Sequence, residues 1–211
     1  MRLMLIGQKW LGAGALELLL GKGHDVAFVA APAGDRLHLA AVAAGVPVAD
    51  PGRILAASWV PPGTDLIVAA HSHSYITGGA RRVARFGAIG YHPSLLPRHR
   101  GRDAVRWTIH MRDQFAGGTV YWMNDRADGG PIAAQDWCHV RDGDTADSLW
   151  RRDLGPMGLR LLGRVLDDVT AGRLVMAPQD EALATWEPAF DRAALSAASP
   201  AAAPARRESA V

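Results

Sequence analysis

Residues 87–101 read Gly-Ala-Ile-Gly-Tyr-His-Pro-Ser-Leu-Leu-Pro-Arg-His-Arg-Gly, and this stretch decides the fold. Its first four residues form a short apolar run that predicts a buried strand, so His92 stands where a strand gives way to a loop. Two prolines and Gly101 keep the following residues out of helix and sheet. Ligands bind at the carboxyl ends of strands in open α/β sheets, and histidine exchanges protons near neutral pH. A lone histidine at such a position is more often structural than catalytic. The role of His92 therefore has to be judged from the sequence of the whole loop.

The segments before this loop alternate between strand and helix patterns. Continuous apolar runs predict buried strands, and apolar residues at helical spacing predict helices. The expected strands are residues 2–6, 24–31, 46–48 and 65–70, and the expected helical pieces are 11–20, 35–44, 52–57 and 78–85. This alternation predicts an α/β fold, with a Rossmann-like, mostly parallel sheet and helices on both faces.

The second half of the chain has a different pattern. A helix is expected over 103–112, followed by strands over 117–124 and 131–140. A hairpin-like pair of these two strands would aim Asp128, in the loop between them, back toward the strand ends. A long amphipathic pattern over 145–171 predicts helices, broken near Pro156.

One folded domain is expected over residues 1–188. Residues 189–211 are rich in alanine, proline, serine and arginine without an apolar period, which predicts a disordered tail.

Composition narrows the classes of function. The chain has 211 residues, 49% of them apolar and 21% charged, which is ordinary for a globular protein. A net charge of +2 is too small to indicate nucleic-acid binding. The single Cys138 excludes an intrachain disulfide and a thiol-based metal cluster. Met1 leads directly into a strand-like run, and no apolar run approaches the ~18 residues of a membrane span, so a cytoplasmic protein is expected.

Two familiar kinds of site are not supported. The glycines after the first strand, beginning with Gly7 and Gly12, fit neither the dinucleotide fingerprint nor the Walker pattern. A helix N-terminus at that point could still hold an anionic group of an acceptor. His71, His73 and His92 lie near one sheet edge, but they lack a recognisable metal-ligand spacing, so no metal is predicted.

Taken together, two motifs carry a family resemblance. Residues 87–101 and the later Asp128-Gly129-Gly130-Pro131-Ile132 resemble the signature of the folate-dependent formyltransferases, in the same order and spacing. The likeness spans about residues 1–188. The opening Ile6-Gly7-Gln8 and the pair Tyr121-Trp122 make the wording most similar to the hydrolase domain of 10-formyltetrahydrofolate dehydrogenase.

The resemblance implies an enzyme that takes a formyl group from 10-formyltetrahydrofolate and passes it to a small amine, on a sugar nucleotide or an amino-acid-like metabolite. It implies catalytic roles for His92, Asp128 and Ser94. The implied folate contacts are His73, Ser74, Tyr75, Ile76, Leu95, Leu96, Asn124 and Asp125. The implied acceptor contacts are Gln8, Trp10, Arg100 and Gly101. A homodimer is compatible with this assignment.

Gly90 departs from the family pattern. The family usually carries an asparagine two residues before the histidine, and glycine has no side-chain donor. The change predicts slower transfer, a water-filled site, or a substitute donor such as Ser94 or a backbone N–H. It also fits the hydrolase domain, which lacks the asparagine and releases formate. A folate- or nucleotide-binding protein without turnover is the third alternative, although keeping both His92 and Asp128 argues against it.

Overall fold

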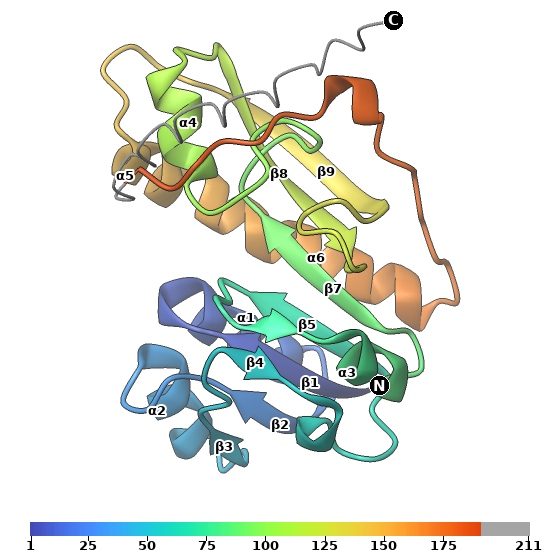
Figure 1. Cartoon of the computed structure of the whole chain (residues 1–211). Coiled ribbons are helices and arrows are strands. Elements are labelled where there is room, and N and C mark those ends of the chain that lie inside the picture. The colour runs from blue at the N-terminus through green and yellow to red at the C-terminus, as the bar shows by residue number, and fades with distance from the viewer. Residues whose placement is uncertain (191–211) are drawn as a thin grey trace, which may run out of the picture.

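A computed structural model of the chain describes residues 1–190 (Figure 1). Its centre is a seven-stranded sheet in the order β3-β2-β1-β5-β7-β8-β9. The first five strands in this order are parallel, whereas β8 and β9 are antiparallel to their neighbours. The strands are β1 (Arg2–Gly7), β2 (Asp25–Ala30), β3 (Val48–Ala49), β5 (Leu66–Ala70), β7 (Ala88–His92), β8 (Phe115–Trp122) and β9 (Ile132–His139). The predicted α/β fold with a mostly parallel sheet is confirmed.

Helices cover both faces of the sheet because its parallel strands are apolar on both sides. Leu3 and Leu5 of β1 belong to one core cluster, whereas Met4 and Ile6 belong to the other. The first cluster lies under α1 (Lys9–Gly21), α2 (Arg36–Ala43) and α6 (Gly155–Thr170), and the second lies under α3 (Gly78–Val83). This arrangement brings the carboxyl ends of β1, β5 and β7 to one edge of the sheet, where residues far apart in sequence meet.

The second half supplies the β8–β9 hairpin and the remaining helices. The α4 helix (Ala104–His110) precedes β8, and α5 (Ala146–Leu149) leads through a π-helical turn, Trp150–Leu154, into α6. The segment is divided just before Pro156, as predicted: the π-helical turn separates α5 from α6, and Pro156 lies in the first turn of α6. The irregular part is the π-helical turn that precedes it.

Two short elements differ from the sequence prediction. The helix expected over 52–57 is wrong: β4 (Ile54–Leu55) pairs with β6 (Tyr75–Ile76) in a separate two-stranded sheet, followed by a 3₁₀ turn, Ala57–Trp59. The strand expected over 46–48 begins instead at Val48. The strands β3 and β4 contain two residues each. Each therefore depends on pairing with a neighbouring strand and not on a local sequence pattern.

The segment that follows α6, residues 173–190, runs back across the β8–β9 side of the molecule (orange to red in Figure 1). Ala177 pairs with Ile132 at the start of β9, and Trp186 pairs with Arg100. We call residues 173–190 the C-terminal strap. Most of the tail predicted over 189–211 lies outside the described residues.

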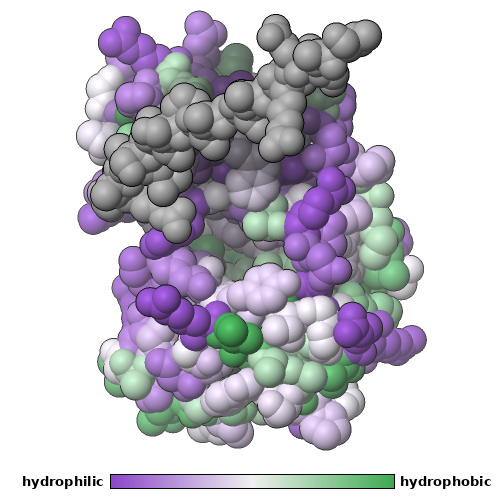
Figure 2. Space-filling model, in the orientation of Figure 1, coloured by the Kyte–Doolittle hydropathy of each residue, from purple (hydrophilic) through white to green (hydrophobic). Residues whose placement is uncertain are grey.

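Among residues 1–190, no helix combines the length and apolar character needed to cross a bilayer. The face shown in Figure 2, apart from its grey atoms, mixes hydrophilic and hydrophobic residues and carries no single broad apolar patch.

Candidate active site

His92 is the last residue of β7, and its side chain is 8% exposed. Its Nε2 lies 2.7 Å from the carbonyl oxygen of His99. Because a carbonyl oxygen only accepts, Nε2 carries a proton and donates it to this bond. The other ring nitrogen, Nδ1, faces Oδ2 of Asp128 at 3.7 Å. Nδ1 is therefore the nitrogen that is available for proton exchange.

Asp128 comes from the loop between β8 and β9, as the hairpin predicted. Its side chain is 17% exposed, and its carboxylate receives one hydrogen bond on each oxygen. The backbone N–H of Gly101 donates to Oδ2 at 2.9 Å, and the hydroxyl of Tyr121 donates to Oδ1 at 2.8 Å. The separation of 3.7 Å from His92 is longer than a hydrogen bond, so the two groups form an ion pair when the ring is protonated.

The backbone around Asp128 is closely constrained. Asp128 has a φ of 50°, in the left-handed region that aspartate tolerates better than most residues. A Cβ added to Gly130 would lie 1.7 Å from the carbonyl oxygen of Trp122, so only glycine fits there. The side chain of Asn124 donates to the carbonyl of Gly129 and accepts from the N–H of Arg126. These contacts fix the direction in which the carboxylate points.

Gly90 leaves the position two residues before His92 without a side chain. A Cβ there would meet Tyr121 and Met123 at 3.4 Å, so steric crowding does not require the glycine. Ser94, the predicted substitute donor, is 1% exposed, and its hydroxyl donates to the carbonyl of Arg98 at 2.6 Å. In this structure Ser94 closes its own loop, and a catalytic contact by Ser94 stays a prediction.

The C-terminal strap connects the loop that carries Asp128 to the loop after β7. Nε2 of Gln179 donates to the carbonyls of Asp128 and Gly130, at 2.8 and 2.7 Å. Its Oε1 accepts from the guanidinium of Arg100, which also makes two hydrogen bonds to Glu181. The Arg100 side chain is only 3% exposed. The guanidinium therefore links the strap to the loop after β7. This buried position gives no support to the acceptor contact predicted for Arg100.

The residues expected to contact folate are spread over several surroundings. Ile76 is 2% exposed and Leu96 is 3% exposed, so both are core residues, whereas Tyr75 is 54% exposed. The Ser74 hydroxyl donates to the carbonyl of Gly52. Asp125 forms an ion pair with Arg81. Folate contacts by these residues, and by His73, Leu95 and Asn124, stay predictions.

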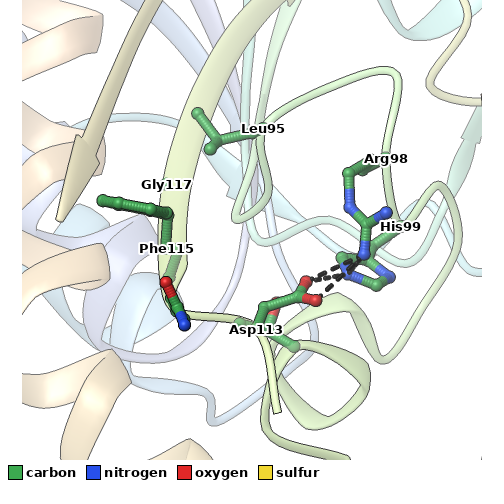
Figure 3. A pocket seen from close by; sticks show the side chains of 9 residues that line it. Leu95, Arg98, His99, Asp113, Phe115 and Gly117 are labelled. Atoms are coloured by element: carbon green, nitrogen blue, oxygen red, sulfur yellow. Dashed lines mark hydrogen bonds and ion pairs between the residues drawn. The ribbon is translucent and has the colours of Figure 1, made fainter. Parts of the chain in front are cut away.

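A cavity of about 280 Å³ lies beside the loop after β7 (Figure 3). Leu95 and Gly117 border it, together with Arg98 and His99, which both contact Asp113. His99 is 3% exposed and also contacts Glu187 of the strap, so its ring lies between two acidic side chains. Neither His92 nor Asp128 lines this cavity, and we do not assign the chemistry to it.

The expected acceptor side is assembled at the ends of β1 and β5. Gln8 follows β1 and directly precedes α1, and Trp10 in the first turn of that helix is 40% exposed. His71 follows β5, and its ring lies 5.5 Å from that of His73 and 6.0 Å from that of Trp150. Gly101, the fourth predicted acceptor residue, uses its N–H on Asp128. Acceptor contacts by Gln8 and Trp10 stay predictions.

Two histidines at this edge, His71 and His73, have lowered pKa values. Burial, and then the charges of Lys9 and His73, lower the pKa of His71 from its usual 6.5 to about 4. Burial, and then the charge of Arg102, also lower the pKa of His73. Within residues 1–190, no three His, Cys, Asp or Glu side chains are grouped so that they could hold a metal ion.

The lowered pKa of His71 predicts a loss of stability in acid. As pH falls from about 6.5 to about 4, the unfolded chain takes up a proton that the folded chain excludes, so the free energy of unfolding falls. Replacing His71 by Asn, which tolerates its φ of 58°, should make that fall less steep. Urea unfolding at pH 7 and pH 5 measures the difference. His110→Asn, on the exposed end of α4, is the control, and equal slopes for His71→Asn and the wild type would contradict the assignment.

Two contributors to the site do not stand out in the sequence. Tyr121 is conspicuous there only as half of an aromatic pair, and Gln179 carries no motif at all. A tyrosine seven residues before Asp128 in a predicted strand is a usable signal, because it places a phenol near the start of the loop. No local signal marks Gln179, whose contacts with Arg100 span 79 residues.

Known proteins resemble this chain in sequence over most of its length. The profile of the family described as formyl transferase matches residues 55–158. The mitochondrial 10-formyltetrahydrofolate dehydrogenase of Mus musculus is 36% identical over 201 residues, which cover 89% of this chain. The chain spans about a fifth of the length of that dehydrogenase (22%).

Solved structures share the fold. Glycinamide ribonucleotide transformylase 1 from Symbiobacterium toebii superposes with a TM-score of 0.69 at 24% identity, over 85% of this chain and 94% of its own. An N-formyltransferase from Helicobacter canadensis, solved with folinic acid and dTDP-3-aminofucose, gives a TM-score of 0.74 at 15% identity, over 88% and 70% of the two chains. By the family profile that its residues 55–158 match and by its likeness to the dehydrogenase sequences, the chain belongs to the formyl transferase family.

Proposed function

We propose that this chain transfers the formyl group of 10-formyltetrahydrofolate to a small amine, with His92 and Asp128 as its acid–base pair. The observation that carries the proposal is the arrangement of His92. Its Nε2 is held by the carbonyl of His99, and its Nδ1 is directed at the Asp128 carboxylate 3.7 Å away, at the carboxyl end of β7. A general acid and a general base thus lie side by side at the sheet edge where ligands bind.

The proposed reaction uses the pair as follows. The amine nitrogen attacks the formyl carbon, a C–N bond forms, and the carbonyl electron pair moves onto oxygen, giving a tetrahedral intermediate. Asp128 accepts the proton that the attacking nitrogen releases. The oxygen electron pair then re-forms the carbonyl as the folate C–N bond breaks, and the Nδ1 proton of the His92 imidazolium passes to the leaving folate nitrogen. The proton on Asp128 restores the imidazolium. The products are a formamide and tetrahydrofolate.

The choice of donor is supported by the relatives. The dehydrogenase that is 36% identical is named for 10-formyltetrahydrofolate, and the Helicobacter canadensis enzyme was solved with folinic acid. That structure also contains an amino sugar on a nucleotide, which supports an amine of this kind as the acceptor.

Hydrolysis of the same donor is the second candidate. Gly90 provides no amide to the developing oxyanion, and the likeness to the dehydrogenase covers 89% of this chain. In this reaction a water molecule replaces the amine, Asp128 accepts its proton, and the products are formate and tetrahydrofolate.

Product analysis distinguishes the two candidates. The protein is incubated with 10-formyltetrahydrofolate labelled with ¹³C in the formyl group, with and without a panel of amino sugars on nucleotides and amino acids. We expect labelled formamide with at least one amine. Labelled formate formed at the same rate with every amine would favour the hydrolase. Bound folate without either product would overturn both.

A further inference from the structure

Tyr121 contacts both unusual features of the site, Gly90 and Asp128. It pairs with Gly90 in the β7–β8 register, and its ring lies in front of that glycine. A Cβ on Gly90 would be 3.4 Å from Cε1 and 3.5 Å from Cζ of the ring. The Tyr121 hydroxyl donates to Oδ1 of Asp128 at 2.8 Å, and the residue is 5% exposed.

The phenol keeps its proton under all ordinary conditions. Burial, and then the charge of the Asp128 carboxylate and its hydrogen bond, hold the pKa of Tyr121 well above its usual 10.0. A neutral phenol beside a carboxylate is a permanent donor, and a charge-assisted bond of this kind is stronger than a neutral one. The hydroxyl therefore holds Oδ1 whether or not the site is turning over.

The two donors to Asp128 together fix its orientation. The Gly101 N–H lies on Oδ2 and the Tyr121 hydroxyl lies on Oδ1, so rotation of the carboxylate about its Cβ–Cγ bond would break both hydrogen bonds. This orientation keeps Oδ2 directed at Nδ1 of His92. The donor to Oδ1 comes from strand β8, whereas the donor to Oδ2 comes from the loop after β7.

We propose that Tyr121 is a positioning residue for the acid–base pair: its hydroxyl orients Asp128 toward His92, and its ring fills the space in front of Gly90. This inference rests on the proposed function. A Cβ at residue 90 would lie in van der Waals contact with the Tyr121 ring, 3.4 Å from Cε1.

Tyr91 provides a matched control. It is also a buried tyrosine, 8% exposed, and its hydroxyl donates to the carbonyl of Leu154 at 2.6 Å. Tyr91→Phe and Tyr121→Phe each remove one buried hydroxyl and its hydrogen bond. Only Tyr121→Phe removes a donor from Asp128, so a difference between the two variants reports on the pair and not on the loss of a buried bond.

The experiment measures kcat, KM and the pH profile of tetrahydrofolate formation for the wild type and both variants. We expect Tyr121→Phe to lower kcat by about tenfold to a hundredfold, because a hydrogen bond to a charged group is lost. Its KM should stay near the wild-type value. The acid limb of its profile should move to higher pH, since a carboxylate that loses a donor binds its proton more tightly. Tyr91→Phe should leave the pH profile in place.

A double variant and a fluorinated tyrosine complete the test. If Tyr121 acts through Asp128, adding Tyr121→Phe to Asp128→Asn should cost little further kcat. If Tyr121→Phe does not fold, a fluorotyrosine at 121, a stronger donor of nearly the same shape, should move the acid limb to lower pH. A wild type without turnover overturns the proposed function and this inference with it. A wild type that turns over, with the same kcat and pH profile when Tyr121 is changed, overturns the inference alone.

Discussion

The variant His92→Ala should lose formyl turnover by about 10²–10⁴-fold, the range that a positioned general acid–base group contributes. It removes Nδ1, the nitrogen that faces Asp128, and the nearby Ser94 hydroxyl cannot replace it, because that hydroxyl is bonded to the carbonyl of Arg98. The measurement is the rate of tetrahydrofolate formation, followed by absorbance. Folate affinity, measured by calorimetry, should stay within a few-fold of the wild type.

A histidine outside the site supplies the control for this variant. His139 lies on the exposed end of β9, so His139→Ala should keep the wild-type rate. The circular dichroism spectra of both variants establish that they fold. A folded His92→Ala protein with the wild-type rate would remove the acid–base role assigned to this residue.

Asp128→Asn should have the second largest effect, a loss of about 10²–10³-fold in kcat, within the range of general acid–base catalysis. The amide is the same size as the carboxylate, and its oxygen can keep the Gly101 N–H, which cannot turn away. The amide nitrogen then faces the Tyr121 hydroxyl, which can rotate to accept. The geometry is retained while the negative charge and the proton-accepting capacity are lost, so kcat should fall while KM changes little.

Asp125→Asn is the matched control for this substitution. It changes the same kind of residue in the same loop, but Asp125 is 85% exposed and pairs with Arg81 outside the acid–base pair. Loss of its predicted folate contact would raise KM and leave kcat unchanged. Steady-state kinetics of the two variants measure the comparison. Equal kcat losses in Asp125→Asn and Asp128→Asn would indicate that the loop as a whole, and not the Asp128 carboxylate, determines the rate.

The succession of strands and helices along the chain is predictable because it depends on the local sequence pattern. The apolar runs at β1, β2, β5 and β7 are continuous and end at glycine, proline or polar residues. The helices between them have apolar residues at helical spacing. The hairpin that carries Asp128 is also predictable, because a polar, glycine-containing loop separates its two strands. The sequence pattern alone therefore predicts that Asp128 points back toward the strand ends, where His92 lies.

The features that the sequence does not reveal depend on contacts distant in the chain. Strands β4 and β6 contain two residues each, which is too short to show a period. Arg100 resembles a ligand-binding residue in the sequence, but its charge is matched by Glu181, 81 residues later. The hydrogen bonds of Gln179 to the Asp128 loop likewise require the whole chain to be folded. A sequence pattern indicates which residues are polar and not which partners satisfy them.

The central claim is that His92 and Asp128 act as one pair, and a double-mutant cycle tests it most directly. The rate of tetrahydrofolate formation is measured for the wild type, His92→Ala, Asp128→Asn and the double variant. Groups that act as a unit show strongly non-additive losses. We predict steady turnover by the wild type and a double variant no more than about threefold slower than His92→Ala. Losses that multiply in the double variant, or a wild type that binds folate without releasing tetrahydrofolate, would contradict the account.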